Sequence, residues 1–441
     1  MKSDRLILIV AVYAAAWFIF VRLPGDIVRS PIAGTDLSSY YTAGYLVRTG
    51  QAPHLYDVGP GDTILGDATG GPYRQAGDAL GIARQHYYIY PPFFALAAAP
   101  LSFASFSTAR AAWLGMDLLL LGLFLAIYLS WRRRDGTPAQ GLELGLIAVT
   151  LGLEFLPLIW ALAIGQTSLL LLALLAGTLL LAKRGHDGAA GCLLGIATAI
   201  KLTPALAVIY FAVRGRGRLA AVAGGVFAAA NLAAVATLGL QANLKFYLEI
   251  VPMMSRGTSY FLNQSLAGTF GRLVGGGDVR QVALESSALV GAFSLITGGA
   301  LVAITARTML RPGRAGGAHG LPRGLTLDLE YSAVLLLTLI LSPISWSHHY
   351  VLAVIPLYSV VAAAGRWELP SRHRFAVAGA AGLAFLLIAR KPHYELFETG
   401  AWRLALSAAM LGALALWGTC LYLLSRGAPP RSAETETLLA A

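Results

Sequence analysis

An acidic residue near the beginning of the chain is the first candidate for chemistry. Asp36 lies in the string GTDLSSYYTAG, directly after an apolar segment, and Tyr40 and Tyr41 follow it. A carboxylate at the membrane edge has a raised proton affinity and can take a proton from a substrate hydroxyl. Aromatic rings beside it suit a sugar site. Aspartate is also a favoured N-cap, so capping of a helix that begins at Leu37 remains an alternative.

Two adjacent histidines are the second candidate. His348 and His349 lie in SPISWSHHY, a short turn between two apolar segments. A histidine here can hydrogen-bond a phosphate oxygen or orient the carboxylate of Asp36. Adjacent side chains on one helix point in different directions, so we expect at most one of them to touch the substrate. Histidine and tryptophan are also typical of the membrane interface, which is the structural alternative.

Polar residues interrupt two other apolar stretches. Lys201 lies in TAIKLTPAL, where two short apolar segments join, and Gln166 lies in IGQTS. A lysine between apolar segments needs an anionic partner or a wet cavity, so we interpret Lys201 as a contact for a lipid-linked phosphate. The alternative for Lys201 is a lysine that reaches to the membrane surface. Gln166 could line the same cavity or belong to an ordinary turn, and both interpretations stay open.

The string FLNQSLAGTFGRL, residues 261–273, is the fourth candidate. Its Asn263, Gln264 and Arg272 could bind hydroxyl groups or a phosphate, since arginine presents a planar fork of donors. A solvated helix in a loop would have the same composition. Both interpretations of these three residues stay open.

Composition places these residues in a membrane protein. Of the 441 residues, 57% are hydrophobic and 12% are charged, and the mean hydropathy is +0.66. We predict an all-α, polytopic integral membrane protein, a bundle of about 12 transmembrane helices within a range of about 10 to 13. The predicted spans are 6–23, 108–131, 142–160, 166–182, 188–200, 202–213, 219–240, 282–306, 327–343, 350–365, 375–390 and 402–425. The two short segments, 188–200 and 202–213, are expected to enter the membrane and return as a pair.

The basic residues indicate the orientation. The net charge is +11, and most lysines and arginines lie in short loops and tails, among them 132–134, 183–184 and 214–218. Short cationic loops stay in the cytoplasm, so this surplus reports orientation, and no nucleic-acid partner is expected. We therefore expect both termini in the cytoplasm and the polar loops on the periplasmic or extracytoplasmic face of the cell (inner) membrane.

The predicted organisation is a single transmembrane domain over residues 1–426. Outer loops 24–107 and 241–281 would cover its active site, and the polar, proline-broken tail 427–441 is expected to be disordered and cytoplasmic. Cys192 and Cys420 lie far apart in apolar stretches, so neither a disulfide framework nor a cysteine metal site is expected.

A series of strings, in this order, resembles family 87 of the glycosyltransferases. This family of polytopic enzymes belongs to the GT-C class and includes polyprenol-phosphate-mannose-dependent α-mannosyltransferases. The strings are TDLSSYYTAG followed by PHLYD, YPPFFALAAAPLS, GQTSLLLLALL, IKLTPAL, NQSLAGTFGRL and SPISWSHHYVL. Each is weak alone, and their shared order makes the set fairly specific. The last two predicted spans carry no matching motif.

The resemblance implies a GT-C-like fold and a reaction. The donor would be a sugar on a polyprenyl phosphate, with mannose as the first candidate for the sugar. The acceptor would be a hydroxyl of a glycolipid or cell-envelope glycan. Asp36 matches the family's early acidic residue and would be the general base, with inversion at the anomeric carbon. A histidine of SWSHH would assist at the donor phosphate or beside the base. This class generally needs no bound metal, and the lipid-linked sugar is a co-substrate, so no cofactor is expected; membrane lipids are the other partners.

Two other functions stay open at this point. A transporter or lipid flippase would need paired repeats and a binding site near the midplane, with charges inside its spans. A non-catalytic membrane scaffold would tolerate alanine at Asp36, Lys201 and His348. The polar residues collect at one side of the predicted bundle, which favours the enzyme.

Overall fold

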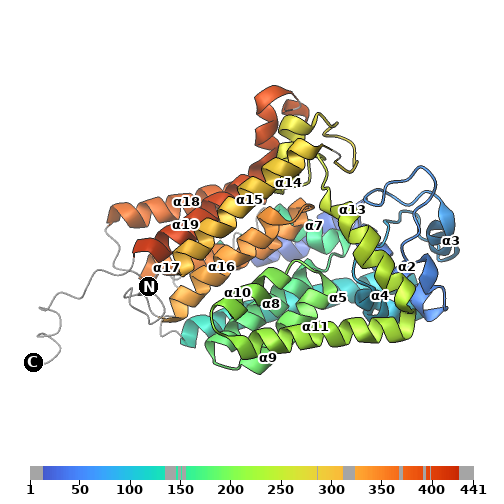
Figure 1. Ribbon diagram of the computed structural model, residues 1–441, viewed down its shortest axis with the longest axis horizontal. Coiled ribbons are helices and arrows are strands. Elements are labelled where there is room, and N and C mark those ends of the chain that lie inside the picture. Colours follow the sequence, from blue (N-terminus) through green and yellow to red (C-terminus); the bar gives the residue numbers. More distant parts are fainter. Residues whose placement is uncertain are drawn as a thin grey trace, which may run out of the picture.

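The computed structural model describes residues 13–134, 146–147, 150, 155–285, 287–310, 323–366, 371–390, 394–397 and 399–426. In these ranges the protein consists of helices and loops, with no β-strand (Figure 1). The prediction of an all-α fold is therefore confirmed. Two isolated antiparallel bridges join loop segments within the described chain. One pairs Asp67 with His86, and the other pairs Asn263 with Trp346.

The helices of the described chain are joined by loops of different lengths. They are α2 (Thr35–Arg48), α3 (Gly71–Ala79), α4 (Pro92–Ala98), α5 (Phe106–Arg134), α7 (Leu156–Ile164), α8 (Ser168–Lys183), α9 (Asp187–Ile200), α10 (Ala205–Val213), α11 (Gly217–Leu238), α12 (Leu240–Lys245), α13 (Val251–Ser255), α14 (Leu266–Phe270), α15 (Ala288–Met309), α16 (Arg323–Leu341), α17 (Val354–Arg366), α18 (Ser371–Ala389) and α19 (Ala408–Arg426). Segments of π-helix occupy Phe18–Val28, Phe246–Ile250 and Gly271–Gly275. Turns of 3-10 helix occupy Ala52–His54, Ala99–Phe103, Ser347–Ala353, Tyr394–Leu396 and Gly400–Ser407.

Seven helical segments of the described chain are long and apolar enough to cross a membrane. They are α5, α11, α15, α16, the segment Ser347–Ala364 that runs into α17, α18, and the segment Gly400–Ser425 that contains α19. The pair α7 and α8, bent by 118°, would make an eighth span. The prediction of a polytopic membrane protein is confirmed. The count of about 12 stays a prediction, because predicted spans 6–23 and 142–160 lie partly outside the described residues.

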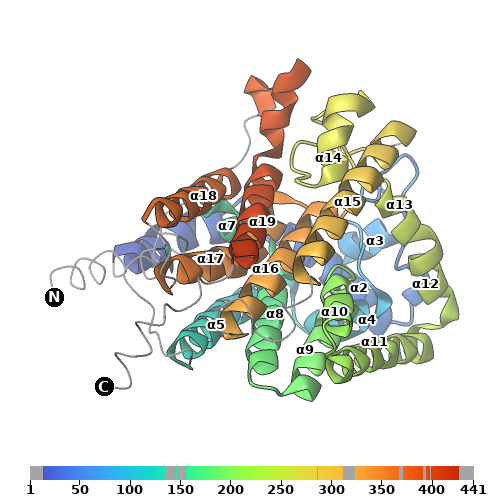
Figure 2. The same ribbon diagram turned by 60° about the vertical axis from the view of Figure 1, so that its left-hand side comes forward.

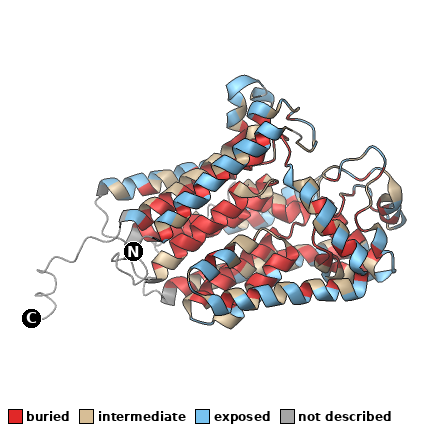
Figure 3. Ribbon diagram, viewed as in Figure 1, coloured by how far each residue is buried: buried red, intermediate tan, exposed pale blue. Residues whose placement is uncertain are grey.

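The burial pattern separates a protein core from a surface for lipid. Figure 3 shows α16 and α17 as largely buried, whereas α11, α15 and α18 carry exposed positions along their length. Many of these exposed side chains are apolar, such as Leu232, Leu295 and Leu386. Apolar residues on the outside of long helices are stable against hydrocarbon tails rather than against water.

The helices α8 to α11 run alternately between two ends of the molecule. The turns after α8 and α10 carry the basic residues, and Lys183 and Arg214 there pair with Asp328 and Glu330 of α16, each at 3.0 Å. The opposite end holds the start of α8 and the junction of α9 and α10. Helices α2, α3 and α4 gather at that same end, at the right of Figures 1 and 2. The fold therefore brings the first outer loop to the polar breaks that interrupt the apolar segments.

Candidate active site

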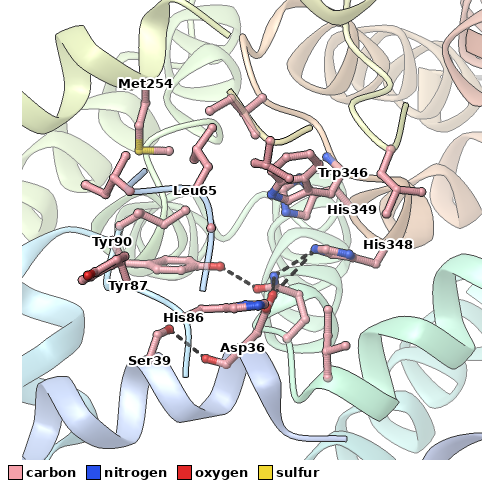
Figure 4. Close-up of a pocket in the computed structure, with 18 of the residues that line it drawn as sticks. Asp36, Ser39, Leu65, His86, Tyr87, Tyr90, Met254, Trp346, His348 and His349 are labelled. Atoms are coloured by element: carbon pink, nitrogen blue, oxygen red, sulfur yellow. Dashed lines mark hydrogen bonds and ion pairs between the residues drawn. The ribbon is translucent and has the colours of Figure 1, made fainter. Parts of the chain in front are cut away.

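A cavity of about 580 Å³ lies where the first outer loop meets these helix ends. Figure 4 shows its polar side chains converging on one space. Its polar lining includes Asp36, Asp67, His86, Gln166, Lys201, His348 and His349, and its apolar lining includes Ile64, Leu65, Phe246, Met254 and Ile344. A polar wall facing an apolar one suits a ligand with a polar head and a hydrocarbon part.

The carboxylate of Asp36 projects into the cavity from the first turn of α2. The helix begins at Thr35 with Gly34 as its N-cap, and no side chain makes a capping hydrogen bond there. The alternative that Asp36 caps a helix beginning at Leu37 is therefore wrong. Instead its Oδ1 lies 2.9 Å from His86 Nδ1 and its Oδ2 accepts a hydrogen bond of 2.6 Å from Gln166 Nε2. A negative charge in this turn is also stabilised by the positive end of the helix dipole.

Gln166 fixes the other side of the carboxylate. Its Oε1 accepts a hydrogen bond of 2.7 Å from the hydroxyl of Tyr90, and its Nε2 lies 3.1 Å from His348 Nε2. Because Oε1 faces a donor, the amide orientation that presents Nε2 to Asp36 is the one that satisfies both ends. Gln166 thus connects α2 with the turn Ser347–Ala353 that carries His348 and His349, which we call the histidine turn. It lines the cavity and is more than an ordinary turn residue.

Two glycines allow α2 and α7 to approach each other. Gly165 has φ of +71°, and a Cβ there would lie 2.8 Å from the Cβ of Leu37. Gly34 has φ of +75°, and its N–H donates a hydrogen bond of 2.8 Å to the carbonyl oxygen of Ala163. Left-handed backbone suits glycine, and the missing side chains leave room for this contact. Asp36 and Gln166, which follow these glycines, are brought together as a result.

We predict that Gly165→Ala lowers the free energy of unfolding more than Gly185→Ala does. Both glycines have positive φ, at +71° and +77°, so both variants incur backbone strain. A Cβ at Gly185 would have no heavy atom within 4 Å, whereas one at Gly165 would press on Leu37. Overpacking of this kind costs about 1–3 kcal/mol. Melting curves of the detergent-solubilised variants would measure the difference. Equal destabilisation of the two variants would show that α2 and α7 can move apart without loss of stability.

The two histidines and Lys201 form the wall beside Gln166. His348 Nε2 lies 3.8 Å from Asp36 Oδ2, and His349 Nε2 lies 2.9 Å from Lys201 Nζ. The backbone N–H of Trp346 donates to His349 Nδ1 at 3.2 Å, which fixes the ring. The expectation that adjacent histidines point in different directions agrees with this geometry, since His348 faces the carboxylate and His349 faces the lysine. Both line the cavity, so the expectation that at most one of them could touch the substrate is not supported by their positions.

The two tyrosines of the first string lie outside the cavity. Tyr40 is fully buried behind it, and its hydroxyl lies 2.7 Å from Gln166 Oε1 and 2.9 Å from the hydroxyl of Tyr90. Tyr41 points away and donates to the carbonyl oxygen of Ala104 at 2.6 Å. The prediction that these rings contact the sugar is not supported by their positions. Tyr40 supports Gln166, and Tyr41 holds α2 against the loop.

The residues Asn263, Gln264 and Arg272 are also outside the cavity lining, and they are buried rather than solvated. Asn263 donates to the carbonyl oxygens of Thr258 and Pro343, and Gln264 donates to those of Phe261 and Leu406. These bonds satisfy buried backbone groups.

Arg272 has the same structural role. Its guanidinium donates to the carbonyl oxygens of Tyr260 and Asn263 and to Ser407 Oγ. The three candidate residues of the string 261–273 neither line the cavity nor face solvent, so both interpretations of that string are wrong for them. They hold the second outer loop against the histidine turn and the segment before α19.

Two cavity residues, His86 and Asp67, were not singled out from the sequence. His86 Nδ1 faces Asp36, and its Nε2 lies 3.0 Å from Asp67 Oδ1. The backbone bridge between Asp67 and His86 sets this contact. The available signal was a lone histidine in a polar outer loop, in RQHYYIY, and nothing in its spacing links it to Asp36.

The charges around Asp36 keep it ionised. Burial raises the pKa of its carboxyl, but the hydrogen bond and charge of His86, with smaller contributions from His348 and Lys201, outweigh burial, so the pKa lies below its ordinary value. The raised proton affinity expected from the sequence is therefore wrong. Burial lowers the pKa of His86, and the hydrogen bonds to Asp36 and Asp67 more than reverse this, raising it to about 9. Asp36 is thus a carboxylate beside an imidazolium at neutral pH.

In the described residues, no cluster of three or more His, Cys, Asp or Glu side chains has the arrangement of a metal site. Cys192 and Cys420 are free thiols. The polar groups of the cavity are instead engaged with one another. The expectation that the reaction needs no metal stays a prediction.

The fold and the cavity define a polytopic membrane protein with a cavity lined by carboxylates, histidines and a lysine at one end of its helical bundle. The model of glycosyltransferase family 87 matches residues 88–320, more than half of the chain. The chain therefore belongs to glycosyltransferase family 87. No solved structure gives a significant match.

Curated relatives in this family come from mycobacteria. The chain is 29% identical over 282 residues to a polyprenol-phosphate-mannose-dependent alpha-(1-2)-phosphatidylinositol mannoside mannosyltransferase of Mycobacterium tuberculosis, covering 60% of the chain and 59% of that protein. It is 30% identical over 279 residues to a corresponding phosphatidylinositol pentamannoside mannosyltransferase of Mycolicibacterium smegmatis, covering 61% and 60%. A phosphatidylinositol mannoside mannosyltransferase of the latter organism is 29% identical over 339 residues, covering 72% and 71%. The first two matches thus span about three fifths of the relatives' length.

Proposed function

We propose that this protein is a membrane glycosyltransferase that moves a sugar from a polyprenyl phosphate to a hydroxyl of a glycolipid or cell-envelope glycan. Mannose is the sugar that we propose. The relatives are named as polyprenol-phosphate-mannose-dependent enzymes that act on phosphatidylinositol mannosides. The cavity combines a carboxylate, a lysine and an apolar wall, which are the groups that such substrates require.

The observation that carries this proposal is the position of Asp36. Its carboxylate lines the cavity, is ionised, and is oriented by His86 and Gln166 at 2.9 and 2.6 Å. An ionised and oriented carboxylate is the form that a general base requires. Across the same cavity, Lys201 and His349 offer a place for a phosphate.

The proposed reaction is a single displacement at the anomeric carbon. The acceptor oxygen forms a bond to that carbon while the bond from the carbon to the phosphate oxygen breaks. The electron pair leaves with the polyprenyl phosphate, and Asp36 takes the acceptor proton. This step inverts the anomeric configuration. Because phosphate is already a good leaving group, positioning and charge stabilisation are the main requirements.

The proposed orientation places this site on the extracytoplasmic side of the inner membrane, with both termini in the cytoplasm. It is supported by the basic turns after α8 and α10, which lie at the end opposite the cavity. The apolar side chains Ile64, Leu65 and Met254 of the cavity would lie against the hydrocarbon part of the donor.

A panel of radiolabelled polyprenyl-phosphate sugars tests this function directly. The purified protein in nanodiscs is incubated with mannosyl, glucosyl and arabinosyl donors and with phosphatidylinositol mannosides or native lipid extract. We expect labelled glycolipid with the mannosyl donor, none with GDP-mannose, and a product of inverted anomeric configuration by NMR. Absence of product with every donor, together with flux of unmodified donor across liposomes, would favour a transporter instead.

A further inference from the structure

Asp36, His86 and Asp67 form a chain of charged groups along the wall of the cavity. The exposed fractions of the side chains rise along it, from 17% for Asp36 to 30% for His86 and 43% for Asp67. The contacts along the chain are 2.9 and 3.0 Å, so both ring nitrogens face carboxylate oxygens. Ionised carboxylates only accept hydrogen bonds, so this arrangement satisfies both nitrogens only if the ring carries two protons.

The backbone holds this chain in place from both sides. The residues Asp67 and His86 face each other in an antiparallel bridge, and the N–H of Ala68 donates to the carbonyl oxygen of Gln85 at 2.8 Å. The N–H of His86 donates to Ser38 Oγ on α2 at 3.2 Å, beside the turn that carries Asp36. The histidine is therefore positioned against α2 rather than suspended on a free loop.

We propose that His86, held as an imidazolium between Asp36 and Asp67, is a positioning residue that orients the carboxylate of Asp36 towards the acceptor hydroxyl and keeps it in the form that can take the acceptor's proton. This inference rests on the proposed function. His86 keeps both ring protons throughout, one on Nδ1 facing Asp36 and one on Nε2 facing Asp67. After each transfer Asp36 gives the acceptor's proton to water and is a carboxylate again. His86 thus acts through Asp36 and exchanges no proton with it.

The neighbouring charges fit this role of His86. Arg84 Nε lies 3.1 Å from both carboxylate oxygens of Asp67, and on the other side Asp36 faces His348 and Lys201. The hydrogen bond from His86 lowers the pKa of Asp67 to about 2, although partial burial opposes it. Asp67 is therefore ionised and accepts the hydrogen bond from His86 Nε2–H.

The pH dependence follows from the state of His86. Its pKa of about 9 lies above the ordinary value, so the doubly protonated ring is present below about pH 9 and is lost as the pH rises through that value. We expect kcat of the wild type to fall above about pH 9. In His86→Gln this alkaline fall should disappear. The acidic limb should move to higher pH, because burial of Asp36 is then no longer opposed by the imidazolium.

The test compares His86→Gln and Asp67→Asn with His54→Gln. His54 is a matched control, since its Nδ1 lies 2.8 Å from the carboxylate of Asp57 in the same outer loop and it does not line the cavity. We expect kcat to fall about 10- to 100-fold in His86→Gln, with little change in KM for the donor, and to stay at the wild-type value in His54→Gln. Asp67→Asn should also lower kcat while retaining the histidine. Wild-type kcat and an unchanged alkaline limb in His86→Gln would overturn the proposal.

A second readout separates this inference from the proposed function. NMR titration of ¹⁵N-histidine-labelled protein in nanodiscs, with the signal assigned through His86→Gln, reports the ring's protonation without any turnover. A midpoint near 9 supports the charged chain, and a midpoint near the ordinary 6.5 overturns it. If the wild type transfers no sugar from any donor, the proposed function fails whatever this titration gives.

Discussion

Asp36→Asn is expected to abolish sugar transfer, lowering kcat by about 10²- to 10⁴-fold while leaving donor affinity within a fewfold of the wild type. Asparagine has almost the same shape as aspartate but cannot take a proton from the acceptor. It also turns one carboxylate oxygen into a donor, which would then face either Gln166 Nε2 or His86 Nδ1. Initial rates with a saturating mannosyl donor, together with donor Kd by calorimetry, measure both effects.

Asp78→Asn is the matched control for this prediction. Asp78 belongs to α3 in the same outer loop, its side chain is 56% exposed, and it pairs with Arg74 on the surface. Its replacement should leave kcat unchanged. Comparable melting temperatures of the two variants would exclude misfolding as the cause. If Asp36→Asn turned over at near the wild-type rate, another group would have to be the base.

Several cavity residues could be predicted from the sequence for one physical reason. Gln166 and Lys201 are polar residues that interrupt apolar runs, and a polar group at such a break must find a partner or a wet cavity. Helices that alternate in direction bring alternate breaks to the same end of a bundle. The breaks before α8 and between α9 and α10 therefore meet at one place, and the histidine turn before α17 joins them.

The roles of the loop residues could not be predicted in this way. His86 and Asp67 face each other because of a backbone bridge between two loop segments, and no periodic pattern encodes such a bridge. Asn263 and Arg272 have the side chains of a ligand site, but their donors satisfy buried carbonyl oxygens. Only the path of the backbone distinguishes a group that binds a ligand from one that holds a loop.

The electrostatics differed from expectation for a related reason. Burial alone would raise the pKa of Asp36, which is what its place at the membrane edge suggested. The structure adds His86, which lies 50 residues further along the chain. Its distance in sequence does not indicate a contact with Asp36. This imidazolium at hydrogen-bond distance, together with His348 and Lys201, outweighs the desolvation of the carboxylate.

Lys201→Met is expected to weaken binding of the donor phosphate by about 10- to 150-fold, the loss that follows removal of a charge-assisted hydrogen bond. Lys201 lines the cavity, and none of the described carboxylates lies within ion-pair distance of its Nζ. Burial lowers the pKa of its amino group to about 7, and a phosphate bound beside it would favour the charged ammonium form. Methionine retains much of the apolar length without the charge. Calorimetry with a short-chain polyprenyl phosphate and with the corresponding uncharged polyprenol measures the effect on each ligand.

The uncharged alcohol distinguishes loss of a phosphate contact from a damaged cavity. If Lys201 binds the phosphate, Lys201→Met lowers affinity for the phosphate ester and leaves affinity for the alcohol unchanged. Lys245→Met is the matched control, because Lys245 already pairs with Asp57 at 2.8 Å and does not line the cavity. It should bind both ligands as the wild type does. An equal loss for ester and alcohol in Lys201→Met would show instead that the lysine maintains the packing at the junction of α9 and α10.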